Sequence, residues 1–113
     1  MKRKKCLILL PTRFNDGTKV PPDVFGSVLR DIDKTLDYYS IGGACEGVYA
    51  MDDGSRARDE SIMVWAVVDV EGIDVLKKLA ARISRKLKQE SIYFEVTDVE
   101  FDFIRPSDEN GDN

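Results

Sequence analysis

The chain has 113 residues, of which 42% are hydrophobic and 34% are charged, and its formal net charge is −4. This length and composition indicate one domain that can bury a core without disulfide or metal staples, and they exclude a disordered chain. The sequence contains no histidine, which removes the commonest general base and most zinc and iron sites, and no apolar run approaches the ~20 residues needed to cross a bilayer.

The first predicted element is a strand over residues 6–10, an unbroken apolar run between a lysine cluster and Pro11. Such a run is typical of a strand covered on both faces, so we place it inside a sheet. It is too short for the h-region of a secretory signal peptide, which needs about 7 to 15 apolar residues, and no small-residue cleavage site follows. We therefore expect a bacterial, cytoplasmic protein.

An amphipathic helix is predicted next. A tight-turn sequence at residues 15–17 and the pair Pro21–Pro22, which suits a helix start, precede it. Apolar residues then recur at helical spacing from residue 23 to residue 39. We expect the helix to end near Ser40, with Gly42 and Gly43 as its stop signal.

A hairpin is predicted in the middle of the chain. Residues 44–51 form its first strand, residues 52–55 its turn, and residues 56–60 a polar connection into a second strand over residues 61–70. The second strand is apolar at every position from 62 to 68, so it belongs inside the sheet. The first strand is mixed in character and belongs at an edge.

The second predicted helix covers residues 73–89, with an apolar stripe on one side and bases on the other. The last strand starts at Ile92 and reaches Phe103. Its apolar positions change from even to odd numbers between Val96 and Val99, which predicts a bulge or a break near residues 97–98. The polar tail, residues 107–113, is expected to be loose.

This order of elements predicts an α+β fold: a ferredoxin-like βαββαβ two-layer sandwich, with a four-stranded antiparallel sheet and two helices on one face. The chain is a single domain, residues 1–113, with an ordered core at about residues 5–105. In the usual strand order the first and third strands lie inside the sheet. The two fully apolar runs occupy those two positions, which supports the prediction independently.

The other face of the sheet is expected to be open. Alternation puts Ile62, Val64, Ala66 and Val68 under the helices and leaves the intervening side chains on the opposite face, with Tyr93 and Glu95 beside them. Self-association as a homodimer through this face or an edge strand, a ligand pocket, and another protein partner are the open interpretations. The candidate interface residues are Tyr49, Met63, Trp65 and Val67.

Nucleic acid is not an expected partner. A four-stranded sheet with aromatic residues resembles an RNA-binding platform in outline, but the chain lacks the glycine–aromatic signature of such modules, and its net charge is negative. Charge is nevertheless segregated: bases crowd the second helix, whereas the segment from residue 90 to residue 112 has many acids and one base, Arg105. Such segregation can orient a partner or a second copy. The candidate contacts for an anion or an acidic partner are Lys78, Arg82, Arg85 and Lys86.

Enzyme motifs are absent from the sequence. A nucleophilic Cys6 or Cys45 would lack a histidine partner, and both thiols are expected to be reduced and structural. No cofactor or metal is expected. The leading hypothesis is a small non-enzymatic binding or regulatory module. The alternative is a small-molecule-binding protein or small enzyme that uses carboxylates and Tyr93 in a pocket.

A resemblance to known proteins is carried by residues 14–21, 46–49, 53–55, 59–61 and 89–95. In these segments the chain resembles a group of small bacterial proteins, a family of unknown function with a ferredoxin-like fold. The similarity spans residues 9–106 and implies the fold and a bacterial origin, but no established activity. Some members of the group are secreted or lipid-anchored, whereas we expect this chain to have no such leader and not to reach the envelope. If the group shares a site, six polar residues are the first to test: Arg58, Glu60, Gln89, Glu90, Tyr93 and Glu95.

Overall fold

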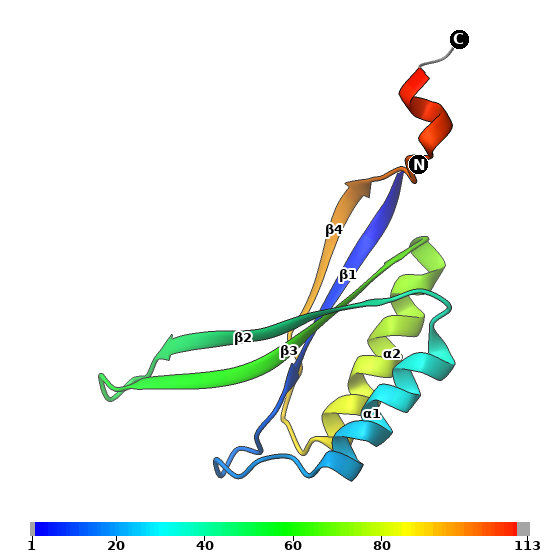
Figure 1. Cartoon of the computed structure of the whole chain (residues 1–113). Helices are drawn as coiled ribbons and strands as arrows, with labels where there is room; N and C mark the ends of the chain where they lie inside the picture. Colours follow the sequence, from blue (N-terminus) through cyan, green and yellow to red (C-terminus); the bar gives the residue numbers. More distant parts are fainter. Residues whose placement is uncertain (1, 111–113) are drawn as a thin grey trace.

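The computed structural model describes residues 2–110 and confirms the predicted α+β, ferredoxin-like fold (Figure 1). Its four-stranded sheet has the order β2-β3-β1-β4, and all pairings are antiparallel. The first and third strands are therefore the inner ones, as the apolar runs predict. The elements are β1 (Lys2–Pro11), α1 (Pro22–Thr35), β2 (Ser40–Ala50), β3 (Arg56–Val68), α2 (Val70–Lys86), β4 (Phe94–Glu100) and the 3₁₀ helix η1 (Pro106–Asn110).

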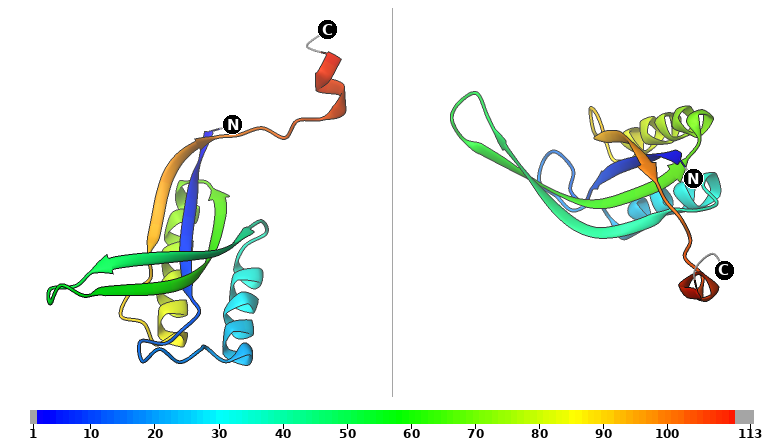
Figure 2. Two further views of the ribbon diagram at one scale, coloured as in Figure 1. Left: turned by 60° about the vertical axis from the view of Figure 1, so that its left-hand side comes forward. Right: turned by 90° about the horizontal axis from the view of Figure 1, so that it is seen from above.

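The core lies between the sheet and the two helices, which cover the same face (Figures 1 and 2). On β1, Cys6 and Ile8 pair with Ala66 and Val64 of β3, and all four side chains are buried on the helix side. The even-numbered positions of β3 face the helices, as alternation predicts. The buried helix residues that complete the core are Val28, Ile32, Leu76, Leu79, Ala80 and Ile83, together with Leu87, which caps the end of α2.

The helices begin and end at local signals. Pro21 and Pro22 open α1, as predicted, whereas α2 begins three residues before its predicted start because the Asp69 carboxylate accepts a hydrogen bond from the Gly72 amide at 2.9 Å. That carboxylate is an N-cap, which satisfies a free amide of the first turn.

The prediction that Gly42 and Gly43 stop α1 is wrong. The helix ends at Thr35, and both glycines lie in β2, where the pairing with β3 shifts between Ile41 and Gly43. Gly43 has a φ of 95°, and a methyl group at Gly42 would lie 2.5 Å from the Trp65 ring. The pair therefore permits a bulge and a close approach to a side chain.

The β2–β3 hairpin is longer than predicted. Residues 56–60, expected to form a polar connection, belong to β3, and the turn at residues 52–55 is confirmed. Because β1 pairs with β3 only from Ser61 onward, residues 46–60 form a ribbon of two strands that projects from the body of the molecule (Figures 1 and 2). We call this ribbon the arm.

The predicted bulge near residues 97–98 is wrong as well, because β4 pairs with β1 without interruption from Phe94 to Glu100. Val96 points to the helix side and Val99 to the open side, so the change in parity reflects apolar side chains on both faces. The pairing ends where Lys2 meets Glu100. The chain then leaves the body, and the tail contains η1, while residues 111–113 lie outside the described residues (Figure 2).

Candidate functional site

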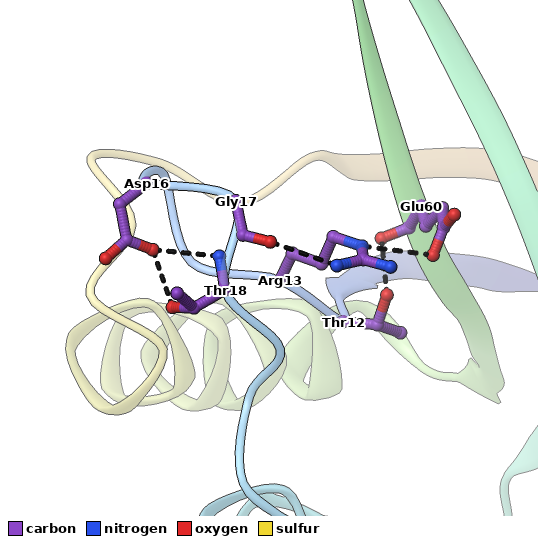
Figure 3. Close-up of polar contacts among 6 residues, drawn as sticks. All are labelled: Thr12, Arg13, Asp16, Gly17, Thr18 and Glu60. Atoms are coloured by element: carbon purple, nitrogen blue, oxygen red, sulfur yellow. Dashed lines mark hydrogen bonds and ion pairs between the residues drawn. The ribbon is translucent and has the colours of Figure 1, made fainter.

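The loop between β1 and α1 is fixed to the base of the arm (Figure 3). Thr12 donates from its amide and its hydroxyl to the Glu60 carbonyl, at 3.0 and 3.2 Å. The Arg13 guanidinium lies 3.5 Å from the Glu60 carboxylate and donates to the Gly17 carbonyl at 3.0 Å. Glu60, one of the six residues to test first, is thus held by a loop that lies far away in sequence.

The far end of this loop is the predicted tight turn. The Asp16 carboxylate accepts from the Thr18 amide at 2.9 Å and from its hydroxyl at 2.6 Å (Figure 3). These hydrogen bonds favour the charged carboxylate, so they hold the pKa of Asp16 below its ordinary value. Gly17 has a φ of 88°, which an L side chain rarely adopts.

Gln89 reaches the same loop from the end of α2. Its side-chain amide donates to the Arg13 carbonyl at 3.3 Å and to the Leu87 carbonyl at 3.1 Å. The Lys88 ammonium lies 5.4 Å from the centre of the Phe14 ring. The loop therefore joins Glu60 and Gln89. Sequence analysis missed Arg13, since a single arginine in a loop carries no signal of such contacts.

An open groove of about 620 Å³ lies beside the C-terminal half of α2. On its α2 side, Ala80, Ala81 and Ser84 have small side chains, and Lys77 and Arg85 are bases. Ile92 and Phe94 contribute apolar surface. We call this hollow the α2–β4 groove. Its lining residues are Lys77, Ala80, Ala81, Ser84, Arg85, Gln89, Glu90, Ser91, Ile92 and Phe94.

The basic side chains of α2 have two different environments. Lys86 lies 2.6 Å from the Asp31 carboxylate and donates to the Ser27 hydroxyl at 2.7 Å, so it links α2 to α1. Lys78, Arg82 and Arg85 are exposed and take part in none of the ion pairs among the described residues. Of the four predicted anion contacts, three are therefore available to a partner.

The open face of the sheet carries Trp65. Trp65 pairs with Leu7 of β1 and with Ser40 of β2, and the Lys5 ammonium lies 5.0 Å from the centre of its ring. Met63 and Val67 share the face and are half-buried. Trp65 thus lies on the side opposite the helices, where alternation predicts it.

Tyr93 and Glu95 lie on the open face at the start of β4. The Tyr93 hydroxyl donates to the Glu95 carboxylate at 2.8 Å, and this bond, with the negative charge of Glu95 and a smaller contribution from Tyr49, raises the pKa of Tyr93. A raised pKa keeps the phenol protonated, which does not favour it as a base.

The six residues to test first therefore lie in three places. Arg58 is on the arm, 2.5 Å from Glu46 of the neighbouring strand. Glu60, Gln89 and Glu90 surround the loop and the α2–β4 groove, and Tyr93 and Glu95 lie on the open face. The structure does not bring them together as one site.

The remaining acidic and thiol groups bear on whether the chain has the geometry that a metal site or a reactive thiol needs. Residues 2–110 contain no group of three or more acidic or cysteine side chains placed to hold a metal ion. Burial raises the pKa of the Cys6 thiol, only partly opposed by Lys77, and Cys45 is also a free thiol. No helix among these residues has the length and hydropathy needed to span a membrane.

The chain matches no protein-family model and no curated protein sequence. Solved structures are similar in fold. A phage SAM lyase in complex with S-methyl-5'-thioadenosine shares 18% identity at a TM-score of 0.59 over 91% of this chain and 93% of the other. The Bacillus subtilis GlnK–ATP complex shares 16% identity at a TM-score of 0.60, over 88% of this chain and 84% of the GlnK chain. A divalent cation tolerance protein, CutA1, from Thermus thermophilus shares 12% identity at a TM-score of 0.54, over 97% of this chain and 93% of the CutA1 chain. These likenesses support the ferredoxin-like fold.

Proposed function

We propose that the chain is a small, non-enzymatic cytoplasmic binding or regulatory module that self-associates, in its simplest form as a homodimer, through the open face of its sheet. The observation that carries this proposal is the position of Trp65 among Leu7, Met63 and Val67 on a face that no described helix covers (Figure 2). Apolar side chains gathered on an uncovered face of a sheet often mark a contact with another chain.

The arm supports the same proposal. Val48, Tyr49 and Met51 are 44%, 50% and 49% exposed on a ribbon of two strands. A ribbon of this kind is marginally stable on its own in water, because it has no core of its own. A second copy packed against the arm and the open face would remove these side chains from water.

The test is Trp65→Asp. A carboxylate in the middle of the proposed interface would lose its hydration on assembly, so we expect a folded monomer where the unmodified chain forms a dimer, measured by light scattering and circular dichroism. Tyr38→Asp is the matched control, because Tyr38 is exposed and precedes β2. It should leave the mass unchanged. Val67→Lys provides a second variant if Trp65→Asp does not fold. A folded Trp65 variant with the mass of the unmodified chain would refute the proposal.

A second candidate function is the binding of a small molecule, with an adenine nucleoside as the first class to test. The α2–β4 groove has the size of a ligand site and offers Lys77 and Arg85 to an anionic group and Glu90 to a hydrogen-bond donor. Two proteins of similar fold are complexes with S-methyl-5'-thioadenosine and with ATP.

Thermal unfolding with millimolar ATP or S-methyl-5'-thioadenosine tests this second candidate. A ligand that binds only the folded state raises the melting temperature, and Arg85→Glu should abolish the rise for ATP. Arg82→Glu, outside the residues that line the groove, is the control. Melting curves that no compound shifts would exclude this class of ligand.

A further inference from the structure

The open face of the sheet carries charges of both signs beside its apolar centre. Among the positions that the pairings of β1 with β3 and with β4 place on this face, the charged ones are Arg3 and Lys5 on β1 and Glu95 on β4. Lys5 and Glu95 are half-buried, and Arg3 is exposed. A chain that covers this face must therefore meet two bases and one acid.

Lys5 and Glu95 make no ion pair with each other or with any other described residue. The Lys5 ammonium lies 5.0 Å from the centre of the Trp65 ring, and the Glu95 carboxylate accepts from the Tyr93 hydroxyl at 2.8 Å. Each charge is thus held on the open face by an aromatic side chain of its own molecule. Both remain available to an opposite charge on a second chain.

The strand pairing makes Lys5 and Glu95 diagonal neighbours. Glu95 pairs with Leu7, which lies two positions after Lys5 on β1. With strands about 4.8 Å apart and alternate residues about 6.7 Å apart, the Cα atoms of Lys5 and Glu95 are about 8 Å from each other. A two-fold axis in the plane of the sheet that exchanges these two positions passes midway between them. The same axis crosses between Leu7 and Trp65, because Leu7 pairs with both Glu95 and Trp65.

We propose that two copies pack by their open faces about this axis, so that Lys5 of each copy pairs with Glu95 of the other. The Leu7 and Trp65 side chains of both copies then meet at the centre of the contact. This arrangement rests on the proposed self-association and assigns its polar contacts. A two-fold contact requires a surface that is complementary to itself, and one axis here matches apolar with apolar and acid with base. Charged pairs of this kind fix the register in which two surfaces meet.

The rest of the face suits the same rotation. On a ladder of these spacings, the rotation carries Val67 of one copy over Leu9 and Tyr93 of the other. It carries Arg3, the second base, past Glu95 to the outer side of β4, so no base of this face meets another base. The strands of the two sheets cross at a large angle, nearer to the orthogonal class of sheet packing than to the aligned class.

Two charge reversals on the full chain test the arrangement. In a Lys5→Glu homodimer two carboxylates would face each other at both contacts, and in a Glu95→Lys homodimer two ammonium groups would do so. Each variant should raise the dimer dissociation constant about tenfold or more, measured by sedimentation equilibrium at low salt. Mixed in equal amounts, the two variants should form a heterodimer with about the affinity of the unmodified chain, because both contacts then join opposite charges.

Lys34→Glu is the matched control, because Lys34 is an exposed base of α1 in the helix layer, and it should have no effect. Circular dichroism checks that each variant folds. If a reversal does not fold, Lys5→Gln and Glu95→Gln replace the pair. The double glutamine variant should then weaken the dimer no more than either single variant, because the first substitution already removes the contact.

The outcomes distinguish this arrangement from the proposed function. If Trp65→Asp yields a monomer while the Lys5 and Glu95 variants dissociate like the unmodified chain, the arrangement is refuted and open-face association stands. An unmodified chain that is a monomer, or a Trp65→Asp variant of unchanged mass, refutes both. Reversals that weaken the dimer without recovery on mixing also refute the contact, because the loss then arises within each chain. Recovery on mixing supports a contact between Lys5 and Glu95 of different copies.

Discussion

The body of the molecule and its arm are built from the same sheet but held by different forces. In the body, β1 and β3 are paired on both edges, and their even-numbered side chains are buried beneath the two helices. In the arm, the strand pairing of residues 46–60 is only with each other, and every residue except Gly47 and Ala57 is exposed. The body therefore accounts for its own stability, whereas the arm does not.

This difference supports the proposal that binding takes place away from the core. A folded domain gains nothing for its own stability from a long ribbon with exposed valine, tyrosine and methionine side chains. Loops and projections supported by a rigid body are the usual carriers of binding. The contact at the base of the arm, where Arg13 meets Glu60, lets the loop between β1 and α1 fix the point at which the ribbon leaves the body.

The largest expected effect is on the body. Leu79 is fully buried between α2 and the sheet, so Leu79→Ala should lower the free energy of unfolding by about 2–5 kcal/mol, measured by denaturant titration. Tyr49→Ala in the arm is the control and should change it by less than about 0.5 kcal/mol in a monomeric background such as Trp65→Asp. Equal losses at the two positions would mean that the arm has a core of its own, contrary to the comparison.

A smaller effect is expected in the part of β2 that belongs to the body. A methyl group at Gly42 would lie 2.5 Å from the Trp65 ring, so Gly42→Ala must displace the indole, at a cost of about 1–3 kcal/mol. Trp65 is the only tryptophan, so its fluorescence spectrum reports the displacement directly.

Gly26→Ala is the matched control for this glycine substitution. A methyl group there would meet only the Arg30 guanidinium at 3.5 Å, and alanine in a helix is favoured over glycine by about 0.5–1 kcal/mol. We expect a small gain in stability and an unchanged spectrum. An unchanged spectrum for Gly42→Ala would show that Trp65 does not pack on β2.

The fold could be predicted because its signals are local. The apolar runs of β1 and β3 indicate strands that are covered on both faces, and Asp-Gly at residues 16–17 and 53–54 marks turns whatever surrounds it. The arm could not be predicted in full, since a two-stranded ribbon in water has no buried face, and its polar residues 56–60 look like a loop. Gly42 is needed because the Trp65 ring lies against it, and Trp65 is 23 positions away in the chain, so a local pattern does not reveal this role.

The candidate site was less predictable for the same reason. Glu60 and Gln89 are connected through the loop between β1 and α1: the Arg13 guanidinium and Thr12 contact Glu60, and the Arg13 carbonyl accepts from Gln89. No periodicity in the sequence encodes these contacts. Lys86 carries the same charge as Arg85 and lies on the same helix, yet it faces Asp31 because its position on the helix points to α1. Side-chain chemistry alone does not separate a structural base from an available one.

The smallest expected effect compares identical turns in the two regions. Asp16 in the body and Asp53 at the tip of the arm each accept from the amide and the hydroxyl of the residue two positions later, Thr18 or Ser55. These bonds lower both pKa values. A lowered pKa means that the folded state favours the charged carboxylate. The turns therefore stabilise the fold at a pH above about 3.9, the ordinary pKa of aspartate, and this stabilisation is lost as the pH falls through the lowered pKa.

Carboxyl titration by NMR should therefore place both aspartates below their ordinary pKa, and Thr18→Ala and Ser55→Ala should each raise only the neighbouring value. Although the expected change in pKa is small, the titration of Asp53 also tests whether the tip of the arm is ordered without a partner. Suppose that in the monomer the pKa of Asp16 is lowered while that of Asp53 is ordinary, and that the pKa of Asp53 is lowered only in the assembled protein. The tip of the arm is then ordered by its partner. Two lowered pKa values in the monomer would show that the turn of the arm forms without a partner.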